Sequence, residues 1–231
     1  MGFAALHLTA KASPVWALVT RALCFKIGKK SIMGMCLALH SVSDENIKRI
    51  LGRPELIWRH IASDDPEAYE EATKKNQVGF LSKLFGRKAV TEIEVPNLSF
   101  VEGENVDDDL DKSWQGIHYC MNKTAYEAEP PMDFITVGGE AAGNIDVGYG
   151  PARLFNSETV KEIHSRLLNI SEAKVSANYN PEEMDKLDIY PNIWSRDSDE
   201  GLEYITEYFV NLKNFVANCA NNKLGMAVYM C

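Results

Sequence analysis

The sequence predicts an α/β or α+β fold: one compact domain whose small sheet contains a strand from each end, packed with several helices. A short apolar run of strand length covers residues 33–40, MGMCLALH, and a second covers residues 225–231, GMAVYMC. Apolar side chains at helical spacing dominate the chain between these runs. We therefore expect the two terminal strands to lie in the same sheet.

Residues 1–32 differ from the rest and are predicted to be an extension outside a domain that spans residues 33–231. Residues 1–33 contain five basic residues and no acidic one. Lys11, Arg21 and Lys26 interrupt every apolar run that could cross a membrane. Three interpretations stay open: an unstructured extension, a start site upstream of a true start at Met33, or a eukaryotic transit peptide.

Charge and cysteine content limit the classes of function. The 231 residues carry a net charge of −9, and because residues 1–33 are basic, the remainder carries 19 Lys and Arg against 33 Asp and Glu. A protein domain with this excess of negative charge repels phosphate backbones and anionic lipid, so we expect no nucleic-acid or membrane partner. The five cysteines are scattered, without CxxC spacing. We expect reduced thiols, a cytoplasmic protein, and no metal or cofactor.

The first half of the domain begins with two helices and then a stretch of weak signals. Ser43 is expected to cap a helix with inward-facing Ile47 and Ile50, and Pro54 suits the first turn of the next helix. Residues 76–105 contain glycine and proline between short apolar pieces, which predicts a loop-rich connection.

The segment 107–123, DDDLDKSWQGIHYCMNK, is the most informative one. Helical spacing gives an apolar stripe for the core, made of Leu110, Trp114, Ile117 and Met121. The three leading aspartates would then occupy the positive end of the helix dipole. A polar row lies beside this stripe at the edge of the buried face, where we expect it to be half-buried; it consists of Asp111, Gln115 and His118.

In the second half of the domain, the sequence predicts a turn and three helices. GGEAAG at 138–143 lacks the spacing of a phosphate loop and is interpreted as a glycine stop and turn. Asn156 or Ser157 caps one helix, and Asn180-Pro181 begins another. The longest helix covers 199–222, with an inner stripe of Leu202, Ile205, Phe209, Leu212, Val216 and Cys219.

Four motifs in this order resemble the YfbM-like family, a bacterial family defined as a domain of unknown function. They are MGMCLAL at 33–39, LDKSWQGIHYCM at 110–121, VGYGPARLF at 147–155 and NPEEMDKLDIYPNIW at 180–194. The resemblance covers residues 33–231 and implies a compact single-domain α/β-type fold. It implies no activity, because the family has no established one.

The candidate site residues permit two functional hypotheses. The first is a binding or interaction module of an immunity-like or regulatory kind, whose acidic surface masks a protein partner. The second is a small-ligand enzyme in which His118 is the acid or base, Asp111 orients it, and Lys112 or Arg153 clamps an anionic ligand. Gln115 and Tyr149 complete this ligand-binding set. A purely structural role for His118 and Arg153 is also open. Neither GxSxG nor HExxH occurs in the sequence.

Overall fold

The computed structural model describes residues 34–63, 65, 67, 69–70, 97–196 and 198–231. These residues belong to a compact unit, Gly34–Cys231. The predicted extension at 1–32 lies outside the described residues, as does most of the predicted loop-rich connection at 76–105.

A five-stranded antiparallel sheet forms the centre of this unit, with strand order β2-β1-β5-β4-β3. β1 (Leu37–Val42) and β5 (Gly225–Met230) are neighbours along their full length, so the two terminal strands pair as predicted. β4 (Arg153–Phe155) joins β5 on its other side and carries the short edge strand β3 (Glu140–Ala141). β2 (Asp107–Asp109) is the opposite edge.

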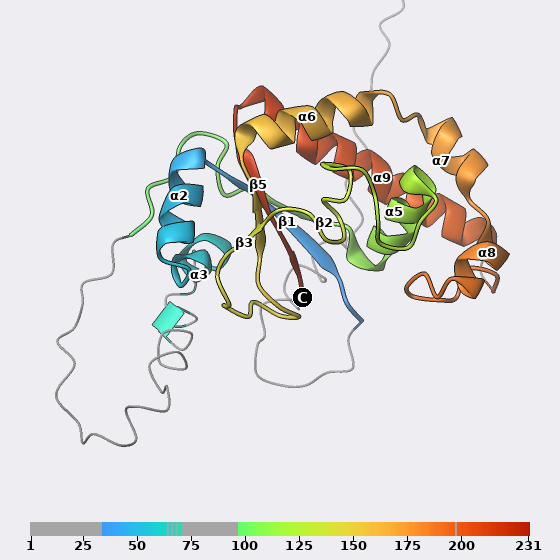
Figure 1. The fold of residues 1–231 in the computed structure, drawn as a ribbon, viewed down its shortest axis with the longest axis horizontal. Coiled ribbons are helices and arrows are strands. Elements are labelled where there is room, and N and C mark those ends of the chain that lie inside the picture. Colours follow the sequence, from blue (N-terminus) through green and yellow to red (C-terminus); the bar gives the residue numbers. More distant parts are fainter. Residues whose placement is uncertain (1–33, 64, 66, 68, 71–96, 197) are drawn as a thin grey trace, which may run out of the picture. The chain divides into compact units, whose positions relative to one another are not determined.

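Seven α-helices are present in the described part of the chain, and they divide into two groups around the sheet (Figure 1). The first group precedes β2 and consists of α2 (Asp44–Gly52) and α3 (Leu56–Ile61). The second group consists of α5 (Trp114–Asn122), α6 (Ser157–Leu168), α7 (Glu172–Asn178), α8 (Pro181–Lys186) and α9 (Ser198–Asn221). Asn156 caps α6 and Asn180 caps α8, as predicted, because each side chain accepts a main-chain N–H of the first turn.

Alternating side chains of the central strands feed two separate cores. Leu37 and Leu39 of β1 enter the larger core, where they pack with residues of α5, α6 and α9. Ala38 and Val42 point the other way, into a smaller core shared with α2 and α3. The sheet is thus covered on both faces, and we refer to its α5–α9 side and its α2–α3 side.

The predicted helix start at Asp107 is wrong. The three leading aspartates form β2, and a 3₁₀ turn at Asp111–Ser113 separates this strand from α5, which begins at Trp114. Asp111 has φ +42, a left-handed conformation that no continuous helix contains. The apolar stripe is nevertheless confirmed, because Leu110, Trp114, Ile117 and Met121 are all buried.

No helix of the described residues is both long and apolar enough to cross a membrane. Within the same residues, no group of three or more His, Cys, Asp or Glu side chains is arranged to hold a metal ion.

Candidate functional site

The predicted polar row lies at and just before α5: Asp111 belongs to the preceding 3₁₀ turn, and Gln115 and His118 belong to the helix. Each of the three side chains binds different partners. The Asp111 carboxylate accepts the Tyr204 hydroxyl of α9 at 2.8 Å and the Cys36 thiol at 3.1 Å. The Gln115 amide donates to the Ala125 carbonyl at 3.1 Å and accepts the Tyr190 main-chain N–H at 2.8 Å. Gln115 is buried, not half-buried as expected, and it ties two loops to α5.

His118 is completely buried, with 0% of its surface exposed. Its Nδ1 lies 3.3 Å from Asn122 Nδ2, and its Nε2 lies 3.5 Å from Thr124 Oγ1. Burial is the largest influence on its pKa and lowers it, which favours the neutral ring. Asp111 bonds to Cys36 and Tyr204, and His118 to Asn122 and Thr124, so the two have no shared partner. The geometry provides no orienting bond between the proposed acid–base pair.

Arg153 of β4 uses its guanidinium to fix a loop. It donates to the carbonyls of Phe134, Gly138 and Ile135 at 2.8, 2.6 and 2.8 Å. Burial lowers its pKa to about 10, partly offset by Asp133, so the group stays charged at neutral pH. Three of the five N–H donors of the guanidinium thus bind main-chain carbonyls, so few donors remain for an anionic ligand.

The remaining two predicted residues do not join Arg153 or His118. Lys112 donates its main-chain N–H to the Tyr204 hydroxyl at 3.0 Å, which brings it beside Asp111. Tyr149 lies in a turn next to the end of β5, where its main-chain N–H donates to the Met230 carbonyl at 3.0 Å, and its side chain is 61% exposed. The structure therefore brings Asp111 and Lys112 together. Tyr190 connects them to two other candidates, because it donates its main-chain N–H to Gln115 and interacts electrostatically with Asp111 and Tyr149. His118 and Arg153 bind other partners.

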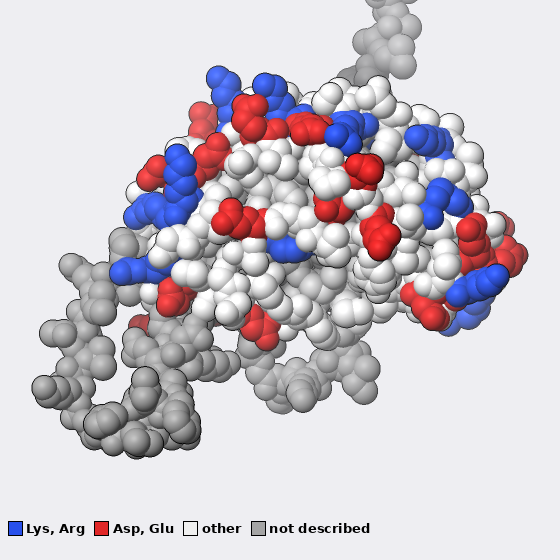
Figure 2. Space-filling model, viewed as in Figure 1, with Lys and Arg blue, Asp and Glu red and all other residues white. Residues whose placement is uncertain are grey.

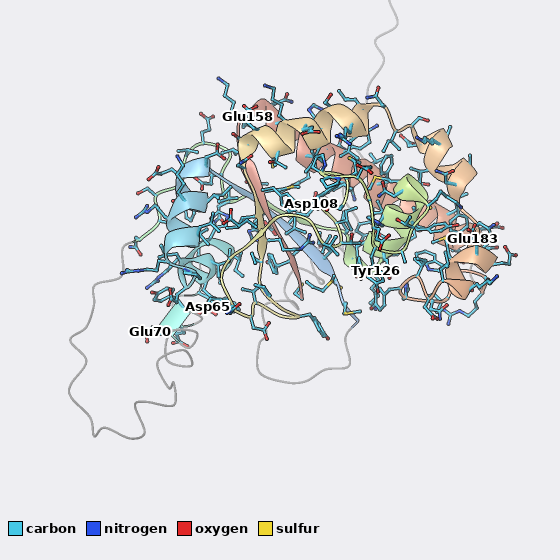
Figure 3. All side chains as sticks on the ribbon, viewed as in Figure 1. Asp65, Glu70, Asp108, Tyr126, Glu158 and Glu183 are labelled. Atoms are coloured by element: carbon cyan, nitrogen blue, oxygen red, sulfur yellow. The ribbon has the colours of Figure 1, made fainter. Side chains whose placement is uncertain are left out.

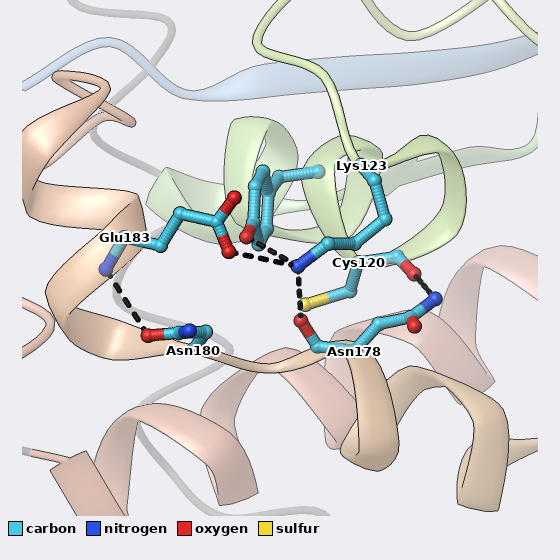
Figure 4. A network of polar contacts seen from close by, with 6 residues as sticks. Cys120, Lys123, Asn178, Asn180 and Glu183 are labelled. Atoms are coloured by element: carbon cyan, nitrogen blue, oxygen red, sulfur yellow. Dashed lines mark hydrogen bonds and ion pairs between the residues drawn. The ribbon is translucent and has the colours of Figure 1, made fainter.

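A second polar network holds α5 against α7 and α8 (Figure 4). Lys123, just after α5, reaches Glu183 of α8 at 3.1 Å, the Asn178 carbonyl at 3.2 Å and the Tyr119 hydroxyl. Asn178 in turn donates to the Cys120 carbonyl at 2.7 Å. Lys123, Glu183 and Asn178 each have a protein partner, so we interpret this network as a structural junction between helices.

A pocket of about 620 Å³ lies beside α2, β3 and the start of α6. Its wall includes Gly138 and Gly139, whose hydrogens face the Asp133 carboxylate and the Phe155 ring; an added Cβ would lie 2.4 and 2.6 Å from them. The segment 138–143 thus forms the predicted turn and enters β3, not a helix. Asp44 accepts both the main-chain N–H and the hydroxyl of Ser157, so the α6 N-terminus already has a carboxylate partner.

A wider groove of about 650 Å³ runs between α7 and α9. Four carboxylates line it, and no Lys or Arg does: Glu172, Asp199, Glu203 and Glu207. Apolar and weakly polar side chains complete the lining: Leu202, Val210, Ser176, Thr206 and Asn211. Leu202 was predicted to belong to the core stripe of α9, but it is only partly buried and contributes to the groove.

The charged side chains of the groove are all acidic. Acidic and basic side chains are interspersed over the face seen in Figure 2. Two acidic residues outside the groove, Glu183 on α8 and Glu158 on α6, lie far apart in Figure 3, and each has a lysine partner. None of the four groove carboxylates forms an ion pair with any other residue that the structure describes. The sequence contains part of this signal, because Asp199, Glu203 and Glu207 are spaced by four, but Glu172 joins them only through tertiary structure.

Sequence reasoning also missed a polar cluster on the α2–α3 side of the sheet. His40 of β1 and His60 of α3 are both buried, with ring centroids 6.0 Å apart. His60 Nε2 lies 3.1 Å from the Ser41 carbonyl, and His40 Nε2 lies 3.2 Å from the Tyr229 hydroxyl. Burial, with His40 as the second cause, lowers the pKa of His60 to about 4.

Comparisons with known proteins agree with this description at the level of fold. A model of the family described as domain of unknown function (DUF1877) matches residues 33–229. The crystal structure of YfbM from Escherichia coli, a protein of unknown function, aligns with a TM-score of 0.55 and 11% identity, covering 85% of this chain and 99% of that one. No curated protein matches. Since the family model covers most of the sequence, the chain belongs to this family of domains of unknown function, as its four motifs predicted.

Proposed function

We propose that this protein is a binding module that receives a basic, helical segment of a partner protein in the groove between α7 and α9. The observation that carries the proposal is the single sign of the charged lining: four carboxylates and no basic side chain. A groove of this kind complements Lys and Arg side chains, and complementary charge speeds and orients association. Leu202 and Val210 offer apolar contacts between the carboxylates.

The unbound groove carries an electrostatic cost. Asp199, Glu203 and Glu207 follow one another at intervals of four residues, so neighbouring carboxylates of α9 repel. Each such pair costs a few tenths of a kcal/mol in a helix. A cationic partner removes this repulsion when it binds, which adds to the direct attraction between the two surfaces.

The acidic-surface hypothesis is therefore favoured over the small-ligand enzyme. The enzyme hypothesis requires Asp111 and His118 to share a site, and their hydrogen bonds are directed to separate structural partners. Of its two proposed anion clamps, Arg153 is bonded to main-chain carbonyls. We further propose a cytoplasmic location, on the scattered cysteines without disulfide spacing.

A synthetic amphipathic helix with Lys and Leu on one face is the appropriate probe. Fluorescence anisotropy would give its dissociation constant for the wild type and for Glu203→Gln/Glu207→Gln. We expect the double substitution to weaken binding about tenfold at low salt, which corresponds to about 1.4 kcal/mol, with a smaller loss at high salt because screening already weakens the wild-type interaction.

The matched control is Glu158→Gln/Glu162→Gln on α6, which removes the same charge at the same spacing outside the groove. Attraction to the net charge of the whole protein would weaken binding equally in both double variants. Equal losses would therefore contradict a groove-specific function, as would unchanged affinity of the groove variant.

A further inference from the structure

Cys36 and Cys231 lie opposite each other at the end of the central β1·β5 ladder. The main-chain N–H of Cys36 donates to the Cys231 carbonyl at 2.8 Å, and the N–H of Cys231 donates to the Cys36 carbonyl at 2.9 Å. This reciprocal pair continues the register in which Leu37 is opposite Met230. Both residues are cysteine thiols of intermediate exposure.

The backbone arrangement is compatible with a bond between the two side chains. In a hydrogen-bonded antiparallel pair the Cα atoms are about 5.5 Å apart, which falls inside the usual disulfide range of roughly 4.4–6.8 Å. Directly opposite side chains project from the same face of a sheet. The main chains of Cys36 and Cys231 therefore have a spacing that most thiol pairs lack, and rotation of the Cys36 side chain away from Asp111 would turn its sulfur towards Cys231.

The two described cysteines of the larger core provide the contrast. Cys120 and Cys219 are fully buried, and burial raises the pKa of each thiol to about 12. Because the thiolate is the nucleophile, these two thiols are chemically inert. Cys36 and Cys231 are partly accessible, and the Cys36 thiol donates a hydrogen bond to Asp111 Oδ1 at 3.1 Å.

We propose that Cys36 and Cys231 form a reversible cross-strand disulfide by exchange with a low-molecular-weight disulfide such as oxidised glutathione. The Cys231 thiolate attacks one sulfur of the small disulfide, and one small thiolate leaves. The Cys36 thiol then loses its proton to solvent, turns from Asp111 and attacks the Cys231 sulfur as the thiolate, and the second small thiolate leaves. The two protein thiols are oxidised, and the small disulfide is reduced to two thiols.

The bond is expected to be labile. The Cβ atoms of directly opposite residues are about 4.5–5.5 Å apart, whereas a relaxed disulfide needs about 3.8 Å. The ends of β1 and β5 must therefore draw together, and a strained disulfide is more easily reduced. Such a bond suits a redox-responsive site and not a permanent staple.

The test is equilibration of the full-length protein in glutathione buffers of graded composition, followed by alkylation and peptide mapping by mass spectrometry. We expect a cross-linked peptide that joins Cys36 to Cys231, appears as the oxidised fraction rises and disappears on return to reduced buffer. Cys120→Ser should leave it unchanged. Cys36→Ser should instead leave Cys231 as a glutathione adduct.

Asp111→Asn tests the second step. Asparagine has no negative charge to disfavour the Cys36 thiolate, so closure of the mixed disulfide should be faster and the Cys231 adduct shorter-lived than in the wild type. The proposal is overturned if no Cys36–Cys231 cross-link forms even with oxidised glutathione alone. It is also overturned if Cys24, outside the described residues, replaces either cysteine in the cross-link that forms.

Discussion

The two faces of the sheet bury polar groups in different ways. On the α5–α9 side, Gln115 and Arg153 place their side-chain groups on main-chain partners, and the Tyr179 hydroxyl is a buried atom without a hydrogen-bond partner among the described residues. On the α2–α3 side, Trp58 Nε1 and His60 Nδ1 are buried without a hydrogen-bond partner among the described residues. A buried polar group without a partner keeps its desolvation cost, so the smaller core should be the weaker one.

Glu104 shows how the smaller core is held in spite of this. Its carboxylate accepts the main-chain N–H groups of Ser43 and Val101 at 2.8 and 2.9 Å and the Asn46 amide at 2.6 Å. Burial opposes the charge, but these bonds outweigh it and the pKa of Glu104 is lowered. The α2–α3 side thus depends on a charged carboxylate and a neutral histidine, whereas the α5–α9 side depends mainly on apolar packing.

The largest effect should come from the apolar side. Trp114 is buried, stacks on Tyr190 with ring centroids 5.8 Å apart, and donates its indole N–H to the Met35 carbonyl at 3.2 Å. Replacing it with alanine should cost about 3–5 kcal/mol of unfolding free energy, measured by urea denaturation. A cost below about 1 kcal/mol would show that the α5–α9 side tolerates a large cavity. It would then contradict the claim that this side depends mainly on apolar packing.

Acid should weaken the α2–α3 side next. The pKa of His60 is about 4 in the folded protein, against about 6.5 when unfolded. The unfolded state therefore takes up the proton first, and stability is lost as the pH falls from 6.5 towards 4. At pH 5 the loss from this group is about 2 kcal/mol. Glu104 adds a loss at lower pH, because its lowered pKa favours the folded state only while it is ionised.

Urea denaturation across this pH range would measure that loss. His60→Gln should flatten the slope of stability against pH, whatever it does to stability at neutral pH. His164→Gln, on the partly exposed surface of α6, is the control and should leave the slope as it is. An unchanged slope in His60→Gln would place the acid sensitivity elsewhere.

A smaller difference in stability is expected between substitutions of the two buried indoles, Trp114 and Trp58. Trp114→Phe removes a satisfied N–H donor, whereas Trp58→Phe removes a buried donor with no partner among the described residues. We expect Trp114→Phe to cost about 1 kcal/mol more than Trp58→Phe, since the second change also removes a desolvation penalty. Equal costs in thermal and urea unfolding would mean that the two sides do not differ in polar satisfaction.

The sequence predicted what depends on periodicity and local chemistry. Helical spacing identified the stripe containing Trp114, and the Asn156 cap followed from its own side chain. β2 was missed because three consecutive aspartates disfavour a strand; this segment is an edge strand, where charged side chains are tolerated. No local signal could show that Gln115 would be buried, because one of its partners is the main chain of Tyr190, 75 residues away.

The candidate site was harder to predict for the same reason. Gln115 and His118 are buried and not half-buried as expected, and Asp111 precedes α5. The hydrogen bonds of these three residues come from Tyr204, Tyr190 and Thr124, which the pattern of α5 does not reveal. The groove needs α7 to lie against α9 before Glu172 meets the carboxylates of α9. Only the acidic spacing within α9 was available from the sequence.

The most direct test of the binding function is a map of where the protein is contacted. Amide chemical shifts recorded by NMR during titration with the Lys/Leu helix would locate the interface without substituting any residue. The account predicts the largest shifts in the groove, at Leu202, Thr206 and Val210 of α9 and Ser176 of α7. Shifts spread over acidic residues of all helices, or concentrated in the pocket beside α2 and α6, would contradict it.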